Sequence, residues 1–130
     1  MGAWGSGPFQ NDAALDWLAR AKLDPQAVEL AFERATGPGY LDVDDGASAV
    51  AAAAVVAAAV DGDDAGLAES GRAVARELRV DAELRSRAVA ALDATLGPSS
   101  ELRSLWDEGP AGARFRVAIA ALRARLVPPA

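Results

Sequence analysis

The sequence contains neither cysteine nor histidine. Without cysteine, the chain has no disulfide, no thiolate nucleophile and no zinc–thiolate site. Without histidine, it cannot form a Ser-His-Asp or Cys-His relay, an imidazole acid or base, or the usual zinc ligand sets. These absences exclude the commonest nucleophilic and zinc-dependent enzymes. They favour a role without catalysis and predict no cofactor.

Large residues that could anchor a core are scarce, with three Trp, three Phe and one Tyr among 130 residues. About a quarter of the chain is instead alanine, which has little apolar area but the highest helix propensity. This composition predicts close-packed helices in a single domain spanning 1–130. Lysine occurs once, at Lys22, against twelve arginines, a bias typical of bacterial GC-rich coding sequences.

No segment has the features of a targeting sequence, because the N-terminus lacks the basic and apolar regions of a signal peptide. The longest uncharged run, GASAVAAAAVVAAAV at 46–60, lies between aspartates. It is shorter than the roughly 20 apolar residues that a membrane span needs. We therefore expect a buried central helix, no membrane association and a cytoplasmic location.

Gly, Pro and capping residues divide the chain into helical segments. The predicted fold is all-α, a single compact bundle of about six helices, with a short helical turn near 100–106 and a frayed tail at 127–130. The six helices are expected at about 12–22, 25–36, 46–60, 67–78, 81–96 and 110–126.

Apolar residues recur at helical spacing within these segments. The predicted core stripes include Leu15, Leu18 and Ala19 in the first helix and Val28, Ala31, Phe32 and Ala35 in the second. No alternating strand pattern is present, apart from a short piece at 40–43 that is predicted to be extended. Because each stripe covers one side of a short helix, the helices must bury them against one another.

The opening MGAWGSGPFQNDAALDWL combines glycines, a proline and two aromatic residues ahead of the first helix. Phe9 lies just before the helix cap and could fold back on the first turn, as in a hydrophobic staple. Trp4 is large enough to cover one end of the bundle. We expect residues 1–10 to form an ordered packed arm. In the alternative, the same loop binds a ligand or partner through Trp4, Phe9, Asn11 and Asp12.

The residues GAWGSGPFQNDAALDWL, together with Tyr40-Leu41, the alanine-rich helix and SELRSLW at 100–106, carry a resemblance. They resemble the domain of unknown function 4259 family, a group of small, mainly bacterial proteins. The resemblance spans nearly the whole chain and implies an all-helical fold. It implies no activity or cofactor, and it assigns no catalytic role to any residue.

Two groups of aspartates could supply carboxylate ligands for a divalent cation. Asp12 and Asp16 are one helical turn apart, and Asp42, Asp44 and Asp45 precede or begin the alanine-rich helix. The alternative function is therefore a small enzyme that uses Mg²⁺ or Mn²⁺. The structural interpretation is that these residues complement helix N-termini and that Asp16 pairs with Arg20.

The stretch DGDDAG at 61–66 is not an EF-hand loop, because Arg72 stands where the loop needs its twelfth-position glutamate. Its aspartates follow the negative end of a helix dipole and therefore need a positive partner. The chain has net charge −9 through Glu69 and +3 from Ser70 onward, so its own arginines are the simplest partner.

The last helix carries Arg114, Arg116, Arg123 and Arg125, but the chain has a net charge of −6. This balance opposes non-specific phosphate binding, so we expect no nucleic-acid partner. The separated charges and alanine-rich helix faces favour a non-catalytic helical protein-interaction module. Its partner would be another protein or a second copy of the chain.

Overall fold

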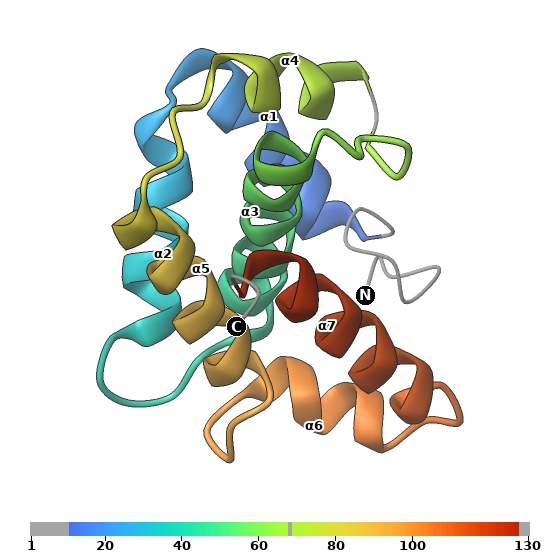
Figure 1. Cartoon of the computed structure of the whole chain (residues 1–130). Helices are drawn as coiled ribbons and strands as arrows, with labels where there is room; N and C mark the ends of the chain where they lie inside the picture. Colours follow the sequence, from blue (N-terminus) through green and yellow to red (C-terminus); the bar gives the residue numbers. More distant parts are fainter. Residues whose placement is uncertain (1–10, 68, 128–130) are drawn as a thin grey trace.

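The computed structural model describes residues 11–67 and 69–127 of the chain. Within them lie seven α-helices and no strand. Figure 1 shows how the helices are arranged. The predicted all-α fold is confirmed, and the turn predicted near 100–106 is a helix. The helices are α1 (Asp12–Leu23), α2 (Gln26–Thr36), α3 (Val43–Asp61), α4 (Glu69–Glu77), α5 (Ala82–Thr95), α6 (Glu101–Asp107) and α7 (Gly112–Leu126).

Helix α3 lies at the centre of the fold and packs against each of the other six helices (Figure 1). All its residues from Gly46 to Ala58 are buried, which confirms the predicted central helix. Alanine makes this arrangement possible, because small side chains allow neighbouring helices to approach from every side. Gly62 ends the helix in the left-handed conformation (φ 75°), and its N–H donates to the carbonyl of Ala58.

By length and composition, α3 is the one helix in the described ranges that could cross a membrane, with a mean hydropathy of 1.6. In this structure 72% of that apolar window is buried inside the protein. A core helix surrounded by other helices has the same composition, because it too needs apolar residues on all sides.

The N-terminus of α3 is fixed by residues from a distant part of the chain. Leu41 forms an isolated parallel bridge with Ser100 in the region predicted to be extended. Glu101 accepts a hydrogen bond from the Val43 N–H (2.8 Å), and Asp42 caps the helix by accepting from Asp45 N–H (2.8 Å). These bonds satisfy donors that a helix N-terminus otherwise leaves unpaired. They also explain why α3 begins three residues earlier than predicted.

Most predicted core stripes are buried, including all four residues predicted for α2. The prediction for α1 was partly wrong, because Leu15 is 40% exposed and Ala19 is also exposed. The buried face of α1 consists of Ala14, Trp17, Leu18 and Ala21. Both sets have helical spacing, but burying the second set encloses the indole of Trp17, the largest apolar side chain in the helix.

The predicted arm, with Trp4 and Phe9, falls within residues 1–10 and lies outside the described residues. Most of the predicted tail also lies outside them, from Pro128 onward.

Candidate functional site

The aspartates of α1 lie at its N-terminal half, on the exposed surface. Asn11 caps the helix, its side chain accepting from the Ala14 N–H at 2.8 Å. Asp12 occupies the first turn, where a negative charge complements the helix dipole. The expected Asp16–Arg20 ion pair is not among those between described residues; Arg20 instead lines a pocket described below.

The second group of aspartates surrounds the start of α3 but does not converge on one point. The Asp42 side chain caps the helix, Asp44 is exposed in the first turn, and Asp45 lines the pocket. Across residues 11–67 and 69–127, no three acidic side chains are placed together so that they could hold a metal ion. In this part of the chain, the metal-dependent alternative therefore has no preassembled ligand group.

The acidic stretch after α3 is paired with an arginine from the opposite half of the chain, as the charge pattern predicted. Arg125 binds the Asp61 carboxylate through Nε and Nη2, at 2.8 and 2.9 Å, and also donates to the Asp63 carbonyl at 2.7 Å. A bidentate arginine–carboxylate pair is the strongest geometry for such a contact. It also places a positive charge at the negative end of α3.

The Asp61–Arg125 pair gives a prediction for acid stability. The hydrogen bond from Arg125 holds the pKa of the Asp61 carboxyl below its ordinary value, although partial burial acts against it. A carboxyl whose pKa is lower in the folded protein stabilises the fold above its unfolded-state pKa of about 3.9. This stabilisation is lost as the pH falls through the folded-state pKa. Because both side chains are about one-third exposed, we expect the pair to add about 0.2–1 kcal/mol to the free energy of unfolding.

Urea denaturation of the native protein and Asp61→Asn between neutral and acidic pH measures this contribution. The difference in unfolding free energy should shrink as the pH falls. Asp63→Asn is the control, because Arg125 binds the carbonyl of Asp63, which this substitution retains. A difference for Asp61→Asn that does not change with pH would contradict the assignment.

The other arginines of α7 are also largely paired. Arg116 binds Asp107 of α6 at 2.6 Å, and Arg123 binds Asp93 of α5 at 2.8 Å. Together with Arg125, these contacts tie α7 to three different elements. Much of the positive charge on this helix is therefore balanced within the fold.

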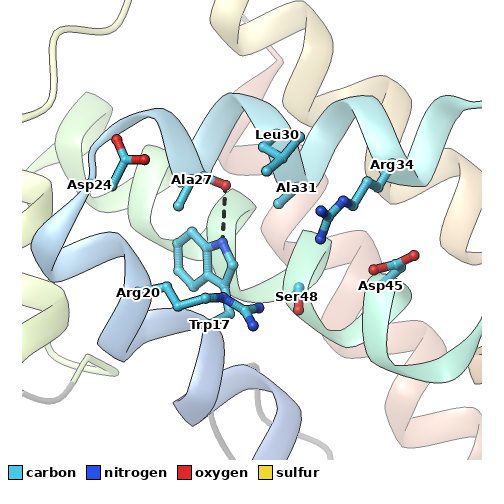
Figure 2. A pocket seen from close by; sticks show the side chains of 9 residues that line it. All are labelled: Trp17, Arg20, Asp24, Ala27, Leu30, Ala31, Arg34, Asp45 and Ser48. Carbon is cyan, nitrogen blue, oxygen red and sulfur yellow. Dashed lines mark hydrogen bonds between the residues drawn. The ribbon is translucent and has the colours of Figure 1, made fainter.

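A pocket of about 120 Å³ opens where α1, α2 and the first turns of α3 meet (Figure 2). Its apolar wall is formed by Trp17, Ala27, Leu30 and Ala31. The indole of Trp17 is held in place because its Nε1 donates a hydrogen bond to the Ala27 carbonyl at 3.1 Å. This wall is therefore fixed by both packing and a directional contact.

Four charged side chains surround the same pocket, two arginines and two aspartates. Arg34 extends toward the space above Ser48 with Asp45 beside it, and Arg20 reaches in from α1 beside Trp17 (Figure 2). Burial raises the pKa of the Asp45 carboxyl, and Asp42 adds to the effect, while Arg34 and Arg20 oppose it. The fourth charge, Asp24, lies at the turn between α1 and α2. The charges of the pocket sum to zero.

Sequence reasoning identified Asp45 as a candidate but missed the rest of this pocket. Trp17 and Arg20 share one helix, whereas Arg34 and Ser48 come from two others. No motif or spacing relates these segments. Only the packing of α1 and α2 against α3 brings their side chains together.

The described geometry is that of a helical protein with a small charged pocket, and sequence comparison places it among known families. Residues 2–117 match the family described as Domain of unknown function (DUF4259). The chain belongs to this family. The match includes the opening motif and confirms the resemblance noted in the sequence. No curated protein and no solved structure is detectably similar to the chain.

Proposed function

We propose that this DUF4259 protein is a non-catalytic interaction module that associates with a second copy of itself through the outer face of α7. The observation that carries this proposal is the distribution of apolar residues around that helix. Helix α7 buries one face in the core, but its opposite face is not the polar surface expected of an amphipathic helix.

The outer face of α7 is a continuous stripe of small apolar side chains. Its members lie on one side of the helix, with Ala120 and Ala121 adjacent in sequence, and all are exposed: Ala113, Val117, Ala120, Ala121 and Ala124. Val117 is 69% exposed, unusually open for a β-branched apolar residue in mid-helix. The buried residues Phe115, Ile119 and Leu122 point the other way. Small side chains would let a partner helix approach to about 8 Å between axes.

The charges beside this stripe favour a second copy as the partner. Arg116 and Arg123 flank one side, and Arg114 and Arg125 lie on the other. Arg116, Arg123 and Arg125 are paired with carboxylates of their own chain, whereas Arg114 is exposed and is in no ion pair between described residues. Two copies of α7 could therefore face each other with three of the four arginines already neutralised, which limits the repulsion between them.

The contact should be weak, because α7 is about 22 Å long and one helix face buries less than a standard interface. We expect the average mass in sedimentation equilibrium to rise with protein concentration. The variant Ala120→Glu should remain monomeric, because it would bury an unpaired charge at the centre of the contact.

Ala90→Glu is the matched control, because Ala90 is also an exposed mid-helix alanine but lies on α5. It should associate like the native protein. A native protein that stays monomeric at all concentrations would overturn the proposal. Equal association of both variants would show that α7 is not the contact.

A further inference from the structure

The pocket between α1, α2 and α3 contains opposite charges that face each other without direct contact. Arg34 and Arg20 both act electrostatically on the Asp45 carboxylate. Neither is among the ion pairs between described residues, so no guanidinium nitrogen of theirs lies within 4.0 Å of it. The space between them can therefore take a group that carries charge itself.

The chemistry of these side chains specifies a complementary ligand. Guanidinium groups bind carboxylates through directed N–H donors, so Arg20 and Arg34 are suited to bind an anionic group of the ligand. The partly buried carboxylate of Asp45 is suited to accept a hydrogen bond from a cationic group of the ligand. Because the pocket has no net charge, a zwitterion keeps the occupied pocket neutral, whereas a simple anion or cation would not.

The size and walls of the pocket restrict the ligand further. A cavity needs about 10–15 Å³ to hold one water molecule, and drug-sized ligands occupy pockets of at least about 300 Å³. At about 120 Å³ the pocket suits a molecule of several non-hydrogen atoms. Trp17 and Leu30 provide an apolar wall for a hydrocarbon side chain.

From this geometry we propose that the pocket binds a free α-amino acid with a small apolar side chain. The ligand carboxylate lies between Arg20 and Arg34, and its ammonium group donates to Asp45. The side chain lies against Trp17 and Leu30. This site goes beyond the proposed self-association and does not depend on it, because the pocket and the outer face of α7 are made of different residues.

Isothermal titration calorimetry of the full chain with L-alanine, L-valine and L-leucine tests the proposal. At least one should bind saturably. Propionate and isobutylamine, each with only one of the two charged groups, should bind much more weakly. Losing a charged hydrogen bond should weaken binding at least about tenfold in Arg34→Gln and in Asp45→Asn.

Two neighbouring substitutions serve as controls. Asp44→Asn removes a carboxylate from the same first turn of α3 but outside the pocket, and Arg114→Gln removes an exposed guanidinium from α7. Both should bind like the native protein, and circular dichroism should show all four variants folded. Ala120→Glu should bind normally whether or not the chain dimerises.

Three results would overturn the amino-acid site. The first is the absence of binding by all three amino acids. The second is equal affinity for propionate, which would indicate a simple anion site. The third is an equal loss of binding in the pocket variants and in the two controls.

Discussion

Replacing Phe32 by alanine is expected to lower the free energy of unfolding by about 3–5 kcal/mol. Phe32 is 1% exposed and is the largest side chain less than 2% exposed among the described residues. It projects from α2 into the core, and α2 packs against both α3 and α5. The truncation removes the apolar contacts of the ring and leaves a cavity that rigid neighbouring helices cannot fill. Since a domain is held together by about 5–15 kcal/mol, the loss is a large share of the total.

Urea denaturation followed by circular dichroism measures the Phe32→Ala effect. Leu23→Ala is the control, because Leu23 is 88% exposed and its truncation should change stability by no more than about 0.5 kcal/mol. Losses of similar size for the two variants would mean that Phe32 is not packed as described.

The second large effect is expected from enlarging a residue of α3 rather than truncating one. Ala52 is 0% exposed and lies mid-way along the helix that all others surround. Ala52→Leu would force a larger side chain between closely packed helices. Overpacking of this kind typically costs about 1–3 kcal/mol, through off-rotamer side chains and backbone shifts.

Ala90→Leu separates this packing effect from helix propensity. Ala90 is exposed on α5, and leucine is nearly as good a helix former as alanine, so its melting temperature should hardly change. Thermal unfolding of both variants provides the comparison. If Ala52→Leu were as stable as Ala90→Leu, α3 would not be enclosed on all sides.

The sequence by itself determined the elements whose signals are local. Asn11, Asp81 and Ser100 cap helices at or next to the predicted starts, because a capping side chain satisfies donors only three residues away. The Gly-Pro pairs at 97–98 and 109–110 separate the last three helices. The alanine run predicted a buried central helix, because this run has no polar face.

The sequence also determined the general charge arrangement. The excess of acid in the first half and of base in the second predicted that the DGDDAG aspartates would find an arginine within the chain. It could not identify Arg125 as that arginine, because Asp61 and Arg125 are 64 residues apart. Their meeting depends on how α7 crosses the end of α3.

Tertiary structure alone decided which of two equally spaced stripes α1 buries, and it placed Leu15 and Ala19 outside the core. It alone assembled the pocket from α1, α2 and α3, and it left the alanine and valine face of α7 exposed. These outcomes share one physical reason. Helix starts and ends depend on hydrogen bonds between near neighbours, whereas a buried face or a pocket depends on which helices pack together and at what angle.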